Sequence, residues 1–217
     1  MFNVNANLFR AVALCQSTEA TRYYLAGVHI EPCPMGGAIM VAIDGHRALV
    51  AHDTDGSTDG RYIVSLDKAA LTACKADRRE ALPRRVTSTD PKAPAWVTSA
   101  DGDQTHLIKD WLVDGTFPDW RRVLPKIDAP AFAAFDSALL ASFEDVARIL
   151  SDGRSAAGRC ISIVTNSANG PSLIKFAASE AVFGVLMPMR WSINSSQHQT
   201  AMPEWMATPA PAEAKAA

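Results

Sequence analysis

The 217-residue chain lacks the short motifs that identify common enzyme classes. It contains no GxSxG, no HExxH, no Walker loop and no paired-carboxylate motif, so no catalytic residues are predicted. His29, His46, His52 and His106 coexist with many aspartates, and composition alone therefore leaves a hydrolase open. A small-molecule-binding module is a further alternative, with no specific feature in its favour.

The four cysteines form no recognisable metal or redox motif. Cys15, Cys33, Cys74 and Cys160 include no CxxC pair, so neither a zinc site nor a thioredoxin-like site is supported. We expect buried or half-buried thiols in a reducing cytoplasm. No metal and no cofactor are predicted.

The chain also has no long apolar run and no excess of positive charge. No stretch approaches the roughly twenty apolar residues of a membrane span, and the N-terminus does not resemble a secretory signal. We therefore expect a soluble, cytoplasmic protein with no membrane partner. A net charge of −2 argues against a simple basic-patch DNA binder, but it allows a ring with a basic inner surface.

What the chain does contain is one order of elements, repeated three times. In the first unit a short strand precedes a helix at residues 7–17, with Leu8, Val12 and Cys15 on one face, and strands follow at 23–31, 38–44 and 46–53. Pro- and Gly-rich turns separate these strands. This unit predicts a sheet with one amphipathic helix on it.

The second and third units repeat that order. The second has a strand at 61–66, a helix at 66–79 capped by Ser65, and strands at 84–90, 95–101 and 105–113. The third has a strand at 131–136, a helix at 137–150 capped by Asp136, and strands at 158–166, 172–178 and 181–189. Such units assemble side by side to bury their sheets, so the chain is predicted to be an α+β repeat protein.

Three segments carry a family resemblance. TRYYLAGVHIE (21–31) with VAIDGHRALVAHD (41–53), VDGTFPDWRRVLP (113–125) and VLMPMR (185–190) occur in this order. Together they resemble the bacterial DNA polymerase III beta sliding clamp. The first two resemble its middle domain and the third resembles the last strand of its final domain.

The resemblance implies a shortened member of that family, of a phage or mobile-element type. Residues 1–124 would form one complete clamp domain and residues 125–191 half of another, followed by a disordered Pro/Ala tail at 192–217. The family's first domain and half of its last would be absent. Helices would line a DNA-sized bore and sheets would lie outside.

The resemblance also implies a pocket that receives apolar peptide motifs of polymerases and of the clamp loader. Leu, Val, Ile and Met would form a deformable socket, and arginines would meet the peptide at its rim. Ile43 and Ala48 replace residues that are typically Thr and Leu in better-known members, so motif preference is expected to differ. The predicted pocket residues are Leu25, Ile43, Gly45, His46, Arg47, Ala48, Pro118, Arg122, Val123, Val185, Leu186, Met187, Pro188, Met189 and Arg190.

Each segment also has a plainer interpretation. Asp44–Gly45–His46 is compatible with an ordinary strand turn, and Met187–Pro188–Met189 with an edge strand. The FPDWRR segment is compatible with a Pro-turn whose Trp120 packs into the core. The match of all three to one pocket favours the peptide-binding interpretation.

A second expected surface is the bore, where phosphate attraction holds duplex DNA without reading its sequence. For any one residue a solvated helix face is an equal alternative. The predicted DNA-facing residues are Arg10, Arg22, Lys68, Lys75, Arg78, Arg79 and Arg148.

The resemblance also implies a ring size, because the number of units in each chain sets the number of chains in the ring. Family rings contain twelve units, so three units per chain predict a homotetramer in which the third unit pairs with the third unit of a neighbour. The main rival function keeps the fold but does not encircle DNA: a decoy or modulator of another clamp.

Overall fold

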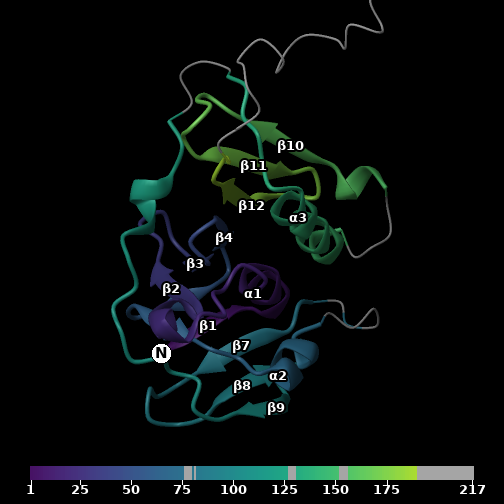
Figure 1. Cartoon of the computed structure of the whole chain (residues 1–217). Helices are drawn as coiled ribbons and strands as arrows, with labels where there is room; N and C mark the ends of the chain where they lie inside the picture. The colour runs from purple at the N-terminus through teal and green to yellow at the C-terminus, as the bar shows by residue number, and fades with distance from the viewer. Residues whose placement is uncertain (76–79, 81, 127–130, 152–155, 190–217) are drawn as a thin grey trace, which may run out of the picture.

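The computed structural model describes residues 1–75, 80, 82–126, 131–151 and 156–189 (Figure 1). The helices, including short 3-10 turns labelled η, are α1 Ala6–Ala13, η1 Ala20–Leu25, α2 Lys68–Ala73, η2 Trp120–Val123, α3 Ser137–Leu150 and η3 Ala157–Arg159. The strands are β1 Phe2–Asn5, β2 Val28–Pro32, β3 Ala38–Ile43, β4 Arg47–Asp53, β5 Ser57–Thr58, β6 Tyr62–Val64, β7 Arg85–Ser88, β8 Ala95–Thr98, β9 Gln104–Ile108, β10 Ile161–Val164, β11 Ser172–Phe176 and β12 Ser179–Leu186.

Asx-type caps start the three α-helices. The side chains of Asn5 and Asp136 each accept hydrogen bonds from two backbone amides in the first turn of α1 and α3. Asp67 caps α2 by accepting from the amide of Ala70. The predicted cap Ser65 is therefore wrong, because a side chain at the position directly before Lys68 is the one within reach of the first free amides.

The first two units exchange their first strands. β1, from the first unit, pairs antiparallel with β7 of the second unit. β6, from the second unit, pairs antiparallel with β2 of the first. Each unit therefore adds a strand to the sheet of the other.

The third unit joins the first through its last strand. β12 pairs antiparallel with β4, from Val182 opposite Ala51 to Leu186 opposite Arg47. The strands form a five-stranded sheet, β5-β1-β7-β8-β9, and a seven-stranded sheet, β10-β11-β12-β4-β3-β2-β6. Figure 1 shows α3, α1 and α2 following one another along the molecule, and α1 and α3 contact each other directly.

The core lies between the helices and the sheets. Phe9 of α1 and Phe143 of α3 are fully buried, and Phe143 contacts the ring of Phe176 on β11. The predicted helix faces point into this core: Val12 and Cys15 are fully buried, and Leu8 packs against the same cluster. The α+β fold with three helix-bearing units predicted from the periodicity is confirmed.

Two predicted strand boundaries are wrong. Residues 20–25 form η1, and β2 begins only at Val28, which pairs with Val64 at the end of β6. Among the described residues no strand pairs with residues 20–25, so the tyrosines that favour a strand take a helical turn. Residues 131–136 form no regular strand; Ala134 makes an isolated bridge to Met189, and the Ala131 amide donates to the Thr165 carbonyl.

The remaining predictions, on the cysteines, the tail, the bore residues and the domain boundary, have different outcomes. Cys15 and Cys74 are buried, but Cys160 is exposed, because it precedes a strand at the edge of the sheet. The tail at 192–217 and the bore residues Arg78 and Arg79 lie outside the described residues. Among the helices described, none is long and apolar enough to cross a membrane. The domain boundary at residue 124 stays a prediction, although the seven-stranded sheet runs across it.

Candidate peptide-binding surface and DNA-facing helices

Two of the predicted pocket segments lie side by side. On the neighbouring strands β12 and β4, Val185 is opposite Ala48, and the Met187 amide donates to the His46 carbonyl over 2.9 Å. Antiparallel pairing thus brings residues 43–48 next to residues 185–189, which are far apart in the sequence. This is the adjacency that the predicted pocket requires.

The turn before β4 is fixed by its own side chains. Asp44 Oδ1 accepts from the amides of His46 and Arg47, each over 2.9 Å, and Gly45 has a φ of +96°. A Cβ atom at Gly45 would lie 2.8 Å from Arg22 Nη1. The left-handed backbone favours glycine here, whereas the Arg22 side chain is flexible enough to move aside.

Arg47 links the first and third units. Its Nε donates to Asp44 Oδ2 over 2.8 Å and its Nη2 to the Leu14 carbonyl over 2.9 Å, while its Nη1 donates to the Ser142 hydroxyl on α3. All three nitrogens therefore already have protein partners. The structure gives this residue a structural role, and its predicted contact with a peptide stays a prediction.

The remaining predicted segment, residues 113–125, covers the face of the same sheet that points away from α1 and α3. Trp120 of η2 packs on Val41 and Val50, with Ile43 and Phe183 around them. The plain interpretation of FPDWRR, a turn that buries its tryptophan, therefore holds for Trp120. It also places the neighbouring Val123 on the side of the sheet that carries Ile43.

The predicted pocket residues divide by exposure. The side chains that reach solvent include Val123 at 39%, Met187 at 39% and Met189 at 53%. Arg190 lies outside the described residues. Buried members are Leu25, Ala48, Val185 and Leu186; half-buried members are Ile43, Arg47 and Pro188; other exposed members are Gly45, His46, Pro118 and Arg122.

A hollow of about 780 Å³ lies beside this surface, between the β2–β6 edge and the connection at residues 112–121. Pro118 is the member of the predicted pocket that lines it. At its floor is Glu31, only 5% exposed, whose carboxylate receives Arg121 Nη2 over 2.6 Å and the Trp120 indole over 3.3 Å. His29 lies 3.3 Å from the same carboxylate and stacks on Phe117.

The ionisation of this cluster follows from burial and pairing. Burial lowers the pKa of His29 below its ordinary value, and the Glu31 carboxylate opposes that only in part. Burial tends to raise the pKa of Glu31, but hydrogen bonds from Arg121 and His29 outweigh it and the pKa is lowered. Glu31 is therefore an anion that binds the 117–121 connection onto the sheet.

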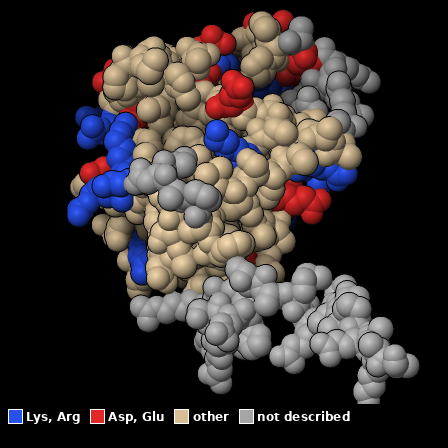
Figure 2. Space-filling model, turned by 90° about the horizontal axis from the view of Figure 1, so that it is seen from above, with Lys and Arg blue, Asp and Glu red and all other residues tan. Residues whose placement is uncertain are grey.

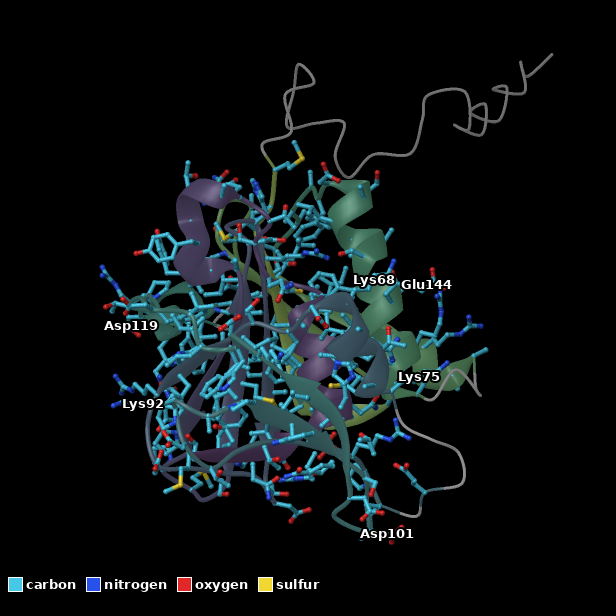
Figure 3. All side chains as sticks on the ribbon, turned by 90° about the horizontal axis from the view of Figure 1, so that it is seen from below. Lys68, Lys75, Lys92, Asp101, Asp119 and Glu144 are labelled. Atoms are coloured by element: carbon cyan, nitrogen blue, oxygen red, sulfur yellow. The ribbon has the colours of Figure 1, made fainter. Side chains whose placement is uncertain are left out.

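The predicted DNA-facing residues do not all lie on the α-helices. Arg10 lies on α1, Lys68 starts α2 and Lys75 follows it. In Figure 3, Lys68, Lys75 and Glu144 lie on the same flank of the molecule. Arg22 lies on η1 instead, paired with Glu19 and directed toward Gly45, next to the predicted peptide surface.

Arg148 is accompanied by acidic residues. On α3 it pairs with Glu144 over 2.9 Å and Asp145 over 3.0 Å, and the Glu144 hydrogen bond raises the pKa of Arg148. Figure 2 shows several Lys and Arg along one edge, and others at the centre and the opposite edge intermixed with Asp and Glu. A uniformly basic helix surface is therefore absent from the described part of α3, since its two carboxylates outnumber its one arginine.

Sequence reasoning did not find two contacts that shape the candidate site: the Glu31 cluster and the Arg47–Ser142 link. A carboxylate at a buried strand position flanked by apolar residues was the available signal for Glu31. The Ser142 contact joins residues 95 positions apart and left no local signal. Within the described ranges no group of three His, Cys, Asp or Glu residues could hold a metal ion.

Solved structures with this fold are DNA polymerase III beta subunits. The beta subunit from Pseudomonas aeruginosa superimposes with a TM-score of 0.58 and 17% identity, over 88% of this chain and 66% of that chain. A sliding clamp from Bacillus subtilis gives 0.56 and 18%, over 87% and 64%. One from Bartonella birtlesii, bound to griselimycin, gives 0.55 and 19%, over 87% and 66%.

No protein-family model matches the chain, and a search of curated proteins finds no match. The structural likeness confirms the sliding-clamp fold that the three segments predicted. The chain spans less than two thirds of each of these solved chains.

Proposed function

We propose that the chain is a non-enzymatic subunit of a DNA sliding clamp, which encircles duplex DNA and tethers replication proteins by their apolar peptide motifs. The observation that carries this proposal is the continuous seven-stranded sheet with α3 and α1 side by side on one of its faces. Helices in a row inside and sheets outside are what a ring around DNA requires. A cytoplasmic location belongs to the same proposal.

Duplex DNA is the expected partner of the helix row. A sliding ring needs salt-sensitive phosphate attraction without base contacts, which Arg10, Lys68 and Lys75 can supply from two helices. The carboxylates beside Arg148 weaken that attraction over α3. Contact with DNA is therefore expected to be loose, which suits sliding.

Polymerases and a clamp loader are the expected partners of the surface around residues 43–48 and 185–189. Met187 and Met189 offer flexible, polarizable side chains that adapt to several apolar ligands. The B. birtlesii clamp, a structural relative, is bound to griselimycin. That relative supports the idea that this fold offers a ligand-binding surface.

A ring of four chains fits the order of the sheets. Within the described residues, β9 ends one sheet and β10 ends the other, so the three-unit chain is an arc with an open edge at each end. If a ring holds twelve units, four such arcs close it, and two-fold contacts at both edges give dihedral symmetry. β9 would then pair with β9 of one neighbour and the third unit with the third unit of another.

Solution mass and DNA retention together test the clamp function. We expect light scattering to give a tetramer and negative-stain images to show a central hole. The ring should stay longer on a closed circular duplex than on the same duplex linearised, because a ring slides off free ends. A monomer at every concentration, with equal retention on both DNAs, would leave only a peptide-binding decoy.

Peptide binding is tested separately by Met187→Asp. Placing a carboxylate in an apolar contact should weaken binding of a fluorescent apolar clamp-binding peptide by about tenfold or more. Met35→Asp, at an exposed turn between β2 and β3, is the matched control and should leave binding unchanged. Equal affinities for the two variants would place the peptide elsewhere.

A further inference from the structure

Within the described residues, unit three lacks a strand pairing that units one and two both have. In units one and two, the strand after the helix receives the first strand of the partner unit: β2 receives β6, and β7 receives β1. The corresponding strand of unit three is β10, and among the described residues it pairs with β11 alone. The first segment of unit three, residues 131–135, joins none of the strands of the described residues and makes only a bridge to Met189 and a bond to Thr165.

Side-chain burial shows the same deficit. Val28 and Ile30 on β2 and Val86 on β7 are fully buried. On β10, Ile161 and Ile163 lie opposite the buried Phe176 and Ile174, so they face the core side of the sheet. Ile163 is nevertheless 39% exposed, because no described strand lies beyond it.

The 131–135 segment carries apolar residues; Phe135, at its end, packs against the core, and two backbone bonds hold the rest. The Ala131 amide donates to the Thr165 carbonyl and the Met189 amide donates to the Ala134 carbonyl, each over 2.8 Å. These bonds run across the ends of β10 and β12, rather than along an edge. Phe132 is 70% exposed.

We infer that two copies of the chain exchange these segments, so that residues 131–135 of each copy pair with β10 of the other. The result is a complete two-unit domain made from two half-domains, built as units one and two are built within one chain. The occupant of the β10 edge is thus a second copy of this chain. This inference rests on the proposed ring and specifies one of its two contacts.

With this exchange, two kinds of contact between units alternate all the way round the ring. Each unit then has one flank where first strands are exchanged and one flank where last strands pair, as β4 and β12 do. Along the chain the contacts alternate: exchange between units two and one, last-strand pairing between units one and three. Exchange at unit three continues that alternation into the next chain, which direct pairing of β10 with β10 would not.

Site-directed cross-linking tests the exchange. The parent carries Cys33→Ser, which leaves Cys160 as the exposed thiol beside β10, since Cys15 and Cys74 are buried. Ala133→Cys in this parent should give a covalent dimer in high yield with a short bis-maleimide. Within one chain the link is disfavoured, because Ala131 bonds to Thr165, about 16 Å from Cys160 at about 3.3 Å per strand residue.

Three controls define the result. Ala133→Cys with Cys160→Ser should give no dimer, and neither should Met35→Cys, which is exposed in the first unit. A dimer from Cys160 alone would indicate direct β10–β10 pairing and overturn the exchange. A cross-link that forms only after removal of residues 190–217 would mean that the tail occupies the edge, and would overturn it for the full chain.

Ile163→Lys gives a second readout. A charge at the exchanged edge should convert tetramers into dimers while the circular dichroism spectrum stays unchanged, and Met35→Lys should leave the mass unaltered. Tetramers that retain circular DNA but yield no 133–160 product would refute the exchange and leave the clamp standing. A 133–160 dimer that forms no ring and retains no DNA would refute the clamp and leave the exchange standing.

Discussion

The first two units and the third unit have the same order of elements but different surroundings. Units one and two each place a first strand in the other's sheet, so β2 and β7 have neighbours on both sides. Unit three places its last strand against β4, and in the described residues β10 has one neighbour. Units with the same order of elements therefore differ in how many strands pair with the strand that follows the helix.

Cutting the chain between the two regions should have the largest effect. Residues 1–124 alone should fold cooperatively, since both exchanged strands are retained. Residues 125–217 alone should not fold, because α3 loses α1 and β12 loses β4, and a single small unit buries too little apolar surface. Circular dichroism and urea titration measure both pieces, and cooperative unfolding of the second piece would break the comparison.

Removing one buried aromatic side chain from each region should show whether the two regions unfold separately. Phe9→Ala in α1 and Phe143→Ala in α3 each delete a fully buried ring and should each cost about 3–5 kcal/mol locally. Phe9→Ala should destabilise the whole molecule, whereas Phe143→Ala should mainly release β10–β12. Hydrogen exchange measures this, and equal acceleration of the β7–β9 amides by Phe143→Ala would contradict it.

Arg47 hydrogen-bonds across the contact between units one and three, which is called the seam below. Arg47→Ala removes bonds to Asp44, Leu14 and Ser142 and should cost about 1.5–3 kcal/mol of unfolding free energy. Ser142→Ala removes one of these bonds and should cost about 1 kcal/mol or less. Urea titration of both variants and of the double variant gives the coupling between the two side chains. Strictly additive effects would show that the seam is held by sheet pairing alone.

Acidification should act on the first region through His29. Its pKa is lowered in the folded protein, so its contribution to stability is complete above the ordinary value of 6.5 and is lost as the pH falls below it. His29→Gln should therefore flatten the fall in unfolding free energy between about pH 7.5 and about pH 5. His106→Gln, on the edge strand β9, is the matched control. An unchanged slope in His29→Gln would show that the Glu31 cluster tolerates a proton.

Local pattern predicted a large part of this structure. The fourteen residues of α3 match the predicted helix at 137–150, including its Asp136 cap, because apolar spacing and capping are properties of neighbouring residues. The 43–48 and 185–189 segments do lie together, as the family resemblance implied. The tyrosines before β2 misled the strand prediction, because a strand exists only where another strand pairs with it.

The sequence by itself determined the three units and their helix faces, because these depend on spacing and on residue type, whereas the candidate peptide-surface residues came from the family resemblance. Only the tertiary structure decided which unit completes which. Strand exchange between units one and two, the seam at Arg47 and the open edge at β10 all join residues distant along the chain. Hydrogen-bond partners of an edge strand are fixed by what lies beside it in space, and local sequence carries no record of that neighbour.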